Sequence, residues 1–299
     1  MSWLGIDIGG TKIDIVLCDD ELREIDSLRV SSDAGQGGDR LLDNAIGAAA
    51  RLTGAAVRGI GVAAAGVIDP DTGEVRLASD TFPRWSGTSL ATELGKHFAV
   101  PVTVDNDANA FLFGEARSGA AAGTPDALAI TLGTGVGGAI LLRNRIWRGA
   151  HGFAGEIGHT PGYSDDLCTC GAVGHLETVA AGPSIARRYA ARSGRSERLA
   201  EIAARAAQSD PAARQAFDDA GTAVGKAIGT AAVLLDCPVV VLGGGVTRSW
   251  PLLTEACAAA LQTFTLGHGA GIAVRLGVLG ERATALGAAA LAAADLPAG

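Results

Sequence analysis

The stretch Ile6-Asp7-Ile8-Gly9-Gly10-Thr11 places a glycine turn between two apolar runs, residues 3–8 and 13–18. Short apolar runs bounded by glycine are typical of buried strands, and their close spacing predicts a hairpin. The stretch Ile130-Thr131-Leu132-Gly133-Thr134-Gly135 repeats this pattern and is followed by another apolar run at 138–142. The repetition predicts a duplicated domain.

The pattern outside these turns alternates between strand and helix. Further strands are predicted at 25–30, 57–65, 102–104 and 239–242, and helices at 41–52, 89–99, 185–207, 212–235 and 283–293. Strands interspersed with helices of this length indicate a mixed α/β chain with a hairpin at one side of its sheet.

The composition excludes several classes of protein. With 24 Lys and Arg against 32 Asp and Glu, the net charge is −8, which argues against nucleic acid as a partner. Apolar residues make up 48% and charged residues 19%, so we expect a folded chain with two domains. No leader pattern and no long uncharged apolar run is present, which favours a cytoplasmic protein without membrane contact.

Three glycine-rich turns could bind phosphate. Without a Cβ, the backbone N–H groups of Gly9, Gly10 and Thr11 can approach an anion closely. The same holds for Thr134, Gly135 and Gly137, and a third run, Gly243-Gly244-Gly245, could lie against a base or ribose. Each turn alone could equally be an ordinary hairpin or strand-to-helix turn. Because the P-loop and dinucleotide patterns are absent, the turns together favour a nucleotide site of another fold.

Two aspartates stand beside these turns. Asp7 precedes Gly9 at the end of the first strand, where a carboxylate would repel phosphate unless Mg²⁺ lay between them. Asp107, within Asp105-Asn106-Asp107, lies where a strand gives way to a helix. Aspartate at that place could be a helix cap or a general base that accepts a proton from a sugar hydroxyl during phosphoryl transfer.

A metal site is the strongest local prediction. His159 is followed by Cys168, Cys170 and His175, which supply the two thiolates and two imidazoles of a closed tetrahedral zinc site. The alternative is a pair of ordinary loop cysteines. A zinc ion with four protein ligands is structural, and it would fix the flanking Glu156 and Glu177, whose carboxylates are suited to orient sugar hydroxyls.

Together these motifs resemble the ROK family of bacterial sugar kinases and sugar-responsive repressors, over essentially the whole chain. The resemblance implies an actin-like ATPase (ribonuclease H-like) α/β fold, duplicated, with two domains around a cleft that holds ATP and the sugar. The smaller domain would comprise residues 1–107 and 283–299, and the larger one 108–282 with the zinc loop. A homodimer is a further expectation of the family.

The resemblance also assigns roles to residues. It makes Asp107 the catalytic base, adds backbone contact from Gly66, and places His159 both on zinc and beside the sugar. The remaining sugar-binding assignments are Asn106, Asp107, Glu156 and Glu177. Nucleotide contacts fall to Gly9, Gly10, Thr11, Lys12, Gly133, Thr134, Gly135, Gly137, Gly243, Gly244 and Gly245.

One residue departs from the family pattern. The zinc loop of the family carries three cysteines, and His175 occupies the third position here. Neutral imidazole in place of thiolate leaves tetrahedral coordination feasible but changes the charge of the site by one unit.

The function expected from these features is ATP-dependent phosphorylation of the 6-hydroxyl of a hexose, with glucose preferred. N-acetylmannosamine, N-acetylglucosamine, fructose and 3-amino-3-deoxyglucose stay open, because the selective contacts would come from loops such as 80–86. A sugar-sensing repressor is disfavoured by the acidic charge and by a first strand that leaves no room before it for a DNA-binding segment. A chaperone or filament ATPase would leave Glu156, His159 and Glu177 unexplained.

Overall fold

The structure, a computed structural model, describes residues 2–53, 57–79, 82–264 and 271–295. Residues 80–81, from the loop expected to select the sugar, and 296–299, from the predicted smaller domain, lie outside these ranges. The chain divides into two compact units. Unit 1 consists of Met1–Pro125, Ala139–Ala154 and Gly277–Gly299, and unit 2 of Asp126–Gly138 and Gly155–Leu276. The predicted domains divide the chain at other residues and stay a prediction.

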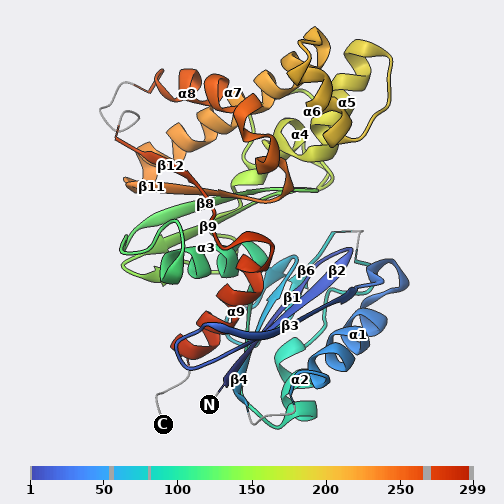
Figure 1. Ribbon diagram of the computed structural model, residues 1–299, viewed down its shortest axis with the longest axis vertical. Coiled ribbons are helices and arrows are strands. Elements are labelled where there is room, and N and C mark those ends of the chain that lie inside the picture. The colour runs from blue at the N-terminus through green and yellow to red at the C-terminus, as the bar shows by residue number, and fades with distance from the viewer. Residues whose placement is uncertain (1, 54–56, 80–81, 265–270, 296–299) are drawn as a thin grey trace. The chain divides into compact units, whose positions relative to one another are not determined.

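Two five-stranded sheets in the described residues have the same topology (Figure 1). Their orders are β3-β2-β1-β4-β7 and β10-β9-β8-β11-β12, so in chain order both run third, second, first, fourth, fifth. The predicted duplication is therefore confirmed. The strands of the first sheet are β1 (Ser2–Ile8), β2 (Lys12–Cys18), β3 (Glu24–Ser31), β4 (Val57–Ala64) and β7 (Val102–Asn106). Those of the second are β8 (Ala127–Leu132), β9 (Val136–Leu142), β10 (Arg145–Ile146), β11 (Val239–Gly243) and β12 (Ala273–Leu276).

Helices cover both faces of the first sheet. Figure 1 shows α1 (Gly38–Ala50) and α2 (Leu90–Phe98) on one side and α9 (Ala283–Asp295) on the other. Leu4, Ile6 and Ile8 of β1 belong to the core on the α1 and α2 side. Trp3 packs with alanines of α9 instead. This alternation along β1 assigns Asp7, an odd-numbered position, to the α9 face.

Two neighbouring glycines let α9 approach the sheet closely. Gly5 of β1 and Gly61 of β4 are register partners. A Cβ on Gly5 would lie 2.0 Å from the backbone oxygen of Ala285, and one on Gly61 would lie 1.8 Å from that of Ala288. Both distances are far inside van der Waals contact, so the backbone of α9 occupies the space that side chains would need.

Gly61→Ala is therefore expected to lower the free energy of unfolding by at least about 1–3 kcal/mol, as overpacked cores do. Gly47→Ala is the matched control, because Gly47 lies exposed in α1 and a Cβ there meets nothing within 4 Å. The control should be stabilised by up to about 1 kcal/mol, since alanine favours helix over glycine. Urea unfolding of both variants gives the comparison, and equal stabilities would contradict the packing described.

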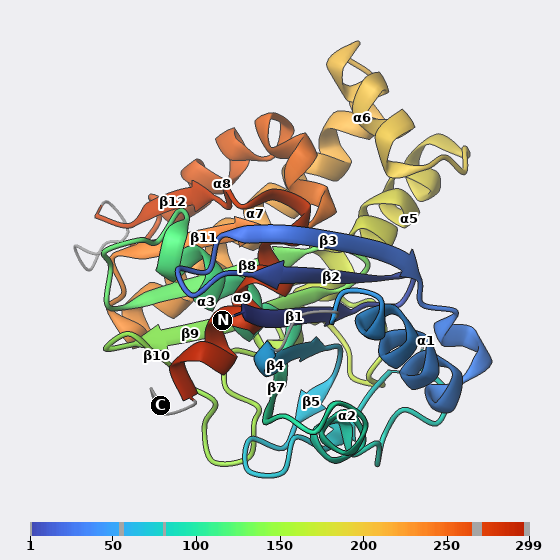
Figure 2. The same cartoon turned by 60° about the horizontal axis from the view of Figure 1, so that its bottom comes forward.

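Unit 2 contains the helices predicted over 185–207 and 212–235, and for the first of these the expectation is wrong. The helix predicted over 185–207 is broken into α5 (Gly182–Ser193) and α6 (Leu199–Ala207), which Figure 2 labels separately. Gly194 ends α5 with a φ of 71°, and Glu201 accepts the backbone N–H of Arg198 to begin α6. The other helices of this unit are α4 (Glu177–Ala180), α7 (Pro211–Leu235) and α8 (Thr254–Leu261).

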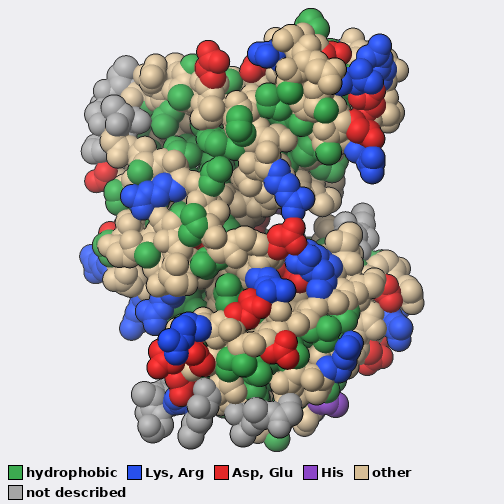
Figure 3. Space-filling view, in the orientation of Figure 1, with side chains coloured by type: hydrophobic (Ala, Val, Ile, Leu, Met, Phe, Trp, Pro, Cys, Tyr) green, Lys and Arg blue, Asp and Glu red, His purple; other side chains and the backbone are tan. Residues whose placement is uncertain are grey.

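Charged side chains of opposite sign are intermixed on the face drawn in Figure 3. Among the ion pairs of unit 1, Arg29 pairs with both Asp14 and Glu281, and Arg282 pairs with Glu24. Among the described residues, the helices are all too short or too polar to cross a membrane.

Candidate active site and metal centre

Three parallel strands of unit 1 end side by side. The register aligns Ile8 of β1 with Ala64 of β4, and Ala64 with Asn106 of β7. Beyond these ends come the Gly9 turn, Gly66 and Asp107, respectively. In open α/β sheets, ligands bind at the carboxyl ends of the strands. The structure thus brings to one edge the residues predicted for this half of the site: Asp7, Gly9, Gly10, Thr11, Lys12, Gly66, Asn106 and Asp107.

The turn between β1 and β2 is tight and held at its base. The Gly9 N–H donates to the Lys12 oxygen at 3.0 Å, and the Ser32 N–H donates to the Thr11 oxygen at 3.2 Å. Thr11 itself is exposed at the tip. The backbone is therefore fixed by its neighbours while the tip stays accessible, as a phosphate-binding turn requires.

The strand-to-helix junction before Asp107 is capped by its neighbour. The Asn106 side-chain oxygen accepts the N–H groups of Ala108 and Asn109 at the start of α3 (Asp107–Ser118), and its amide donates to the Gly66 oxygen at 2.9 Å. Asn106 is thus the N-cap, which leaves Asp107 as the first helical residue. The capping role considered for this segment belongs mainly to Asn106.

An ion pair that the sequence does not reveal lies beneath this junction. Arg148 contacts the buried Asp105 carboxylate with two nitrogens, at 2.9 and 2.7 Å. The second oxygen of Asp105 accepts the Asn109 side chain at 2.7 Å and the Asn106 N–H at 2.8 Å. Arg148 fixes the strand end that carries Asp107, but a single arginine 43 positions away gives no sequence signal for this contact.

The environment raises the pKa of both aspartates. Burial raises the pKa of Asp7 to about 7, with further increases from the negative charges of Asp107 and Asp14. Burial also raises the pKa of Asp107, against the lowering effect of the Ala108 N–H that it accepts. Two carboxyls whose pKa values are moved toward neutrality at one sheet edge are typical of a site built for proton transfer or cation binding.

A chain of charges lies beside Asp7. Asp14, which is 2% exposed, pairs with the Lys12 ammonium at 2.8 Å and with Arg29 at 2.5 Å. Lys12 and Arg29 partly offset the rise in the pKa of Asp7. Asp14 and Arg29 were not singled out from the sequence, where Asp14 stands inside an apolar strand pattern.

Unit 2 brings the other two glycine turns together. β8 and β11 are parallel, with Ile130 opposite Leu242, so Gly133 and Gly243 lie at the same edge of the sheet. Gly244 has a φ of 85°, and a Cβ there would lie 2.3 Å from the Leu132 oxygen. The predicted nucleotide residues of this half are thereby adjacent: Gly133, Thr134, Gly135, Gly137, Gly243, Gly244 and Gly245.

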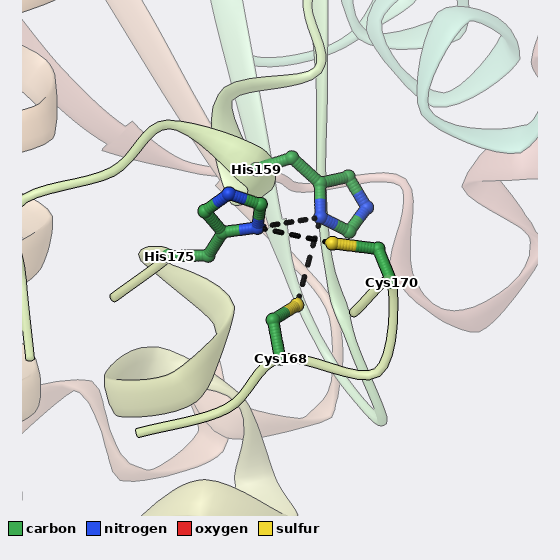
Figure 4. A group of neighbouring side chains, drawn as sticks. All are labelled: His159, Cys168, Cys170 and His175. Atoms are coloured by element: carbon green, nitrogen blue, oxygen red, sulfur yellow. Dashed lines mark hydrogen bonds between the residues drawn. The ribbon is translucent and has the colours of Figure 1, made fainter. Parts of the chain in front are cut away.

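Two histidines and two cysteines of unit 2 converge on one point (Figure 4). His159 ends a 3-10 turn, η2 (Ile157–His159), and the other three belong to the loop before α4. The ligand atoms of His159, Cys168, Cys170 and His175 all lie within 4.8 Å of one another. These are the four residues predicted as metal ligands.

The distances fit a tetrahedral zinc ion. Zinc bonds of ~2.0 Å to nitrogen and ~2.3 Å to sulfur require separations of about 3.3 Å between nitrogens and about 3.5 Å between nitrogen and sulfur. The Nδ1 atoms of His159 and His175 are 3.3 Å apart. The Cys168 Sγ lies 3.7 Å from His159 Nδ1, and the Cys170 Sγ lies 3.3 Å from His175 Nδ1. A donor set of two imidazoles and two thiolates is therefore compatible with a tetrahedral zinc ion at this cluster.

Two glutamates flank this cluster. Glu156 is 3.9 Å from the outer nitrogen of His159, Nε2, while Nδ1 faces the cluster. Glu177 begins α4, and its carboxylate accepts the Val136 N–H at 3.0 Å and the Thr169 hydroxyl at 2.9 Å. Glu156, His159 and Glu177 are thus held around the cluster, all within unit 2.

The cluster predicts that the purified chain binds about one zinc ion, and that Cys170→Ala loses it to a chelator that leaves the wild type loaded. Cys257→Ala, a buried thiol in α8, is the matched control and should keep its zinc. Atomic absorption measures the zinc content of both variants and of wild type after dialysis against the chelator. Equal zinc retention by both variants would remove Cys170 from the ligand set.

Known proteins resemble this chain in both sequence and structure. The model of the ROK family matches residues 3–295. The chain belongs to the ROK family. It is 32% identical to a glucokinase of Halalkalibacterium halodurans, over 95% of this chain and 93% of that protein. Among solved structures, a ROK hexokinase from Thermus thermophilus matches with a TM-score of 0.84 and 32% identity, covering 98% of each chain.

A second solved structure carries ligands. A ROK family glucokinase from Streptomyces griseus, in complex with glucose and AMPPNP, matches with a TM-score of 0.84 and 30% identity, over 98% of this chain and 99% of that one. These matches confirm the predicted two-part α/β fold of the actin-like ATPases.

Other similar proteins are a repressor and a kinase for a different sugar. A xylose repressor of Caldicellulosiruptor bescii is 38% identical over 42% of this chain and 31% of its own length. An N-acetylgalactosamine kinase of a Shewanella species is 29% identical over 89% of this chain and 87% of its own length.

Proposed function

We propose that this ROK protein is an ATP-dependent sugar kinase that phosphorylates the 6-hydroxyl of a hexose, with glucose preferred. The observation that carries the proposal is the Asp107 carboxyl. It is half-buried just beyond the end of β7, and its pKa is raised. The Gly9–Lys12 turn follows β1, which lies in the same sheet with only β4 between it and β7. The glucose and AMPPNP bound to the related S. griseus glucokinase support both the sugar and the phosphoryl donor.

Asp107 is the general base in this proposal. As the 6-hydroxyl oxygen bonds to the γ-phosphorus of ATP, the bond from that phosphorus to the β-phosphate oxygen breaks, and ADP leaves. The hydroxyl proton passes to the Asp107 carboxylate. Arg148 and Asn106 hold the carboxylate in place through the junction they stabilise.

The other residues bind and orient. The hexose is contacted by five residues: Asn106, Gly66, Glu156, His159 and Glu177. The phosphates are bound by the Lys12 ammonium and by backbone groups of two turns: Gly9, Gly10 and Thr11 in one, and Gly133, Thr134, Gly135 and Gly137 in the other. The adenosine is bound by Gly243, Gly244 and Gly245. Mg²⁺, when bound with ATP, would neutralise phosphate charge, and Asp7 is the carboxylate placed to hold it. Zinc at the histidine and cysteine cluster has a structural role.

Release of ADP from Mg-ATP, measured in a coupled assay with a panel of hexoses, tests the proposal. The panel comprises glucose, mannose, fructose, 3-amino-3-deoxyglucose, N-acetylglucosamine, N-acetylmannosamine and N-acetylgalactosamine. Highest kcat/KM with glucose is expected. If an amino or N-acetyl sugar or fructose is preferred, the reaction stands and the assignment to glucose falls.

The second candidate is a sugar sensor without catalysis, which the xylose repressor relative favours. It predicts hexose binding by calorimetry with no ADP release, and gel-shift binding to operator DNA. A homodimer is inferred from the family resemblance, and light scattering of the purified chain tests it.

A further inference from the structure

The Glu177 carboxylate contacts two loops at once. Its Oε2 accepts the Val136 N–H at 3.0 Å, in the glycine turn between β8 and β9. Its Oε1 accepts the Thr169 hydroxyl at 2.9 Å and lies 3.7 Å from the Cys168 Sγ, in the loop that carries the metal ligands. One side chain therefore joins the metal loop to the turn proposed to bind phosphate.

The turn is packed against this carboxylate as well as bonded to it. A Cβ on Gly135 would lie 2.5 Å from Glu177 Oε2, so a larger residue there would displace this carboxylate. Within the turn, the Gly133 N–H donates to the Gly135 oxygen at 2.9 Å, and the Gly182 N–H donates to the Gly133 oxygen at 2.9 Å. A change in the position of Glu177 must therefore move the amide groups on which anion binding depends.

A second contact links the metal ligands to the same strand. Gly158, next to the ligand His159, has no Cβ, and one placed there would lie 1.9 Å from the Val136 oxygen. The amide of Val136 thus faces Glu177, and its carbonyl lies against η2. One side of Val136 therefore contacts a carboxylate bonded to the metal loop, and the other contacts the segment that carries the ligand His159.

We propose that Glu177 couples the metal site to the nucleotide-binding turn, so that zinc binding increases the affinity for nucleotide. The inference rests on the proposed function, in which Gly133–Gly137 contacts phosphate. Zinc fixes Cys168 and the Thr169 that follows it, and Thr169 fixes Glu177. Glu177 in turn holds Val136 in the orientation that anion binding uses. Glu177 acts here as a positioning residue, in addition to its proposed contact with the sugar.

Binding of ADP in the absence of sugar tests this coupling, because the sugar contact of Glu177 then plays no part. Calorimetry compares zinc-loaded wild type with wild type from which zinc has been removed by dialysis against a chelator and return to chelator-free buffer. Zinc removal should weaken ADP binding by at least about fivefold. In Glu177→Ala, ADP binding should be weak with or without zinc. Zinc removal should therefore change the ADP affinity of this variant much less than that of wild type.

A second variant covers the case in which the zinc-free chain loses its fold. Thr169→Val keeps all four metal ligands and removes only the hydroxyl that Glu177 accepts. It should bind ADP more weakly than wild type and speed hydrogen exchange of the Val136 amide, with zinc content unchanged. Thr230→Val is the matched control, because Thr230 is exposed on α7 and donates only to the Lys226 oxygen of its own helix among the bonds described.

The outcomes separate the coupling from the proposed function. Tight ADP binding that neither zinc removal nor Thr169→Val alters would overturn the coupling and leave the kinase proposal standing. An equal effect of zinc removal in wild type and in Glu177→Ala would also overturn it. If zinc-loaded wild type binds no ADP, both the coupling and the proposed function fail.

Discussion

Asp107→Asn is expected to lower kcat for hexose phosphorylation by about 10³-fold, within the range of about 10²–10⁴ that a general base contributes. The amide has the same shape as the carboxyl and can still accept the Ala108 N–H, a bond of 2.8 Å in the wild type. It cannot take up the hydroxyl proton. We therefore expect the loss in kcat with little change in the KM for ATP, measured by coupled ADP release at saturating sugar.

Asp43→Asn is the matched control, because Asp43 is an exposed carboxylate on α1 of the same unit. It should keep the wild-type rate. Thermal unfolding of both variants separates loss of the base from loss of the fold. An Asp107→Asn variant that folds and retains a near wild-type kcat would exclude Asp107 as the base.

The strands and turns of the first sheet were predictable because local sequence determines them. In β1, Ile6 and Ile8 alternate with positions of the opposite face, and Gly9 ends the run, so both the strand and its turn follow from the pattern. The metal cluster was predictable for a similar reason. Cys168, Cys170 and His175 are close in sequence, and their donor atoms suit one ion.

Contacts between residues distant in sequence could not be predicted in this way. Arg148 meets Asp105 only because the segment after β10 folds back to β7. The contact from Glu177 to Val136 likewise depends on a fold that brings residues 41 positions apart together. The break between α5 and α6 was missed because alanine-rich sequence resumes after the polar stretch 192–198. Gly194 lies in that stretch, and its left-handed backbone ends α5.

Asp7→Asn is expected to stabilise the chain above neutral pH by about 2–4 kcal/mol, in buffer without Mg²⁺ or nucleotide. The pKa of Asp7 is raised from 3.8 to about 7 in the folded chain, chiefly by burial. Between these two values the folded state binds more protons than the unfolded state, so stability falls as the pH rises. Three pKa units correspond to about 4 kcal/mol, and the partial exposure of the side chain reduces that figure.

The asparagine does not titrate. The difference in free energy of unfolding between Asp7→Asn and wild type should therefore grow from near zero at pH 4 to its full value at about pH 8. Urea unfolding of wild type and Asp7→Asn at several pH values measures this difference, with Asp43→Asn, at an exposed carboxylate of α1, as the matched control. A stability difference that is the same at pH 4 and pH 8 would contradict a raised pKa at Asp7.

Mg²⁺ and nucleotide should reverse this order of stability. If Asp7 holds the cation of Mg-ATP as proposed, the ionised carboxylate gains a partner that asparagine cannot replace, and ligand binding stabilises the folded state in proportion to its affinity. Mg-ADP should therefore raise the melting temperature of wild type more than that of Asp7→Asn, and ADP without Mg²⁺ should not discriminate between them. The ionised Asp7 carboxylate would then destabilise the free protein, and the bound cation would remove that destabilisation. This behaviour is expected of a binding residue and not of a residue that only packs in the core.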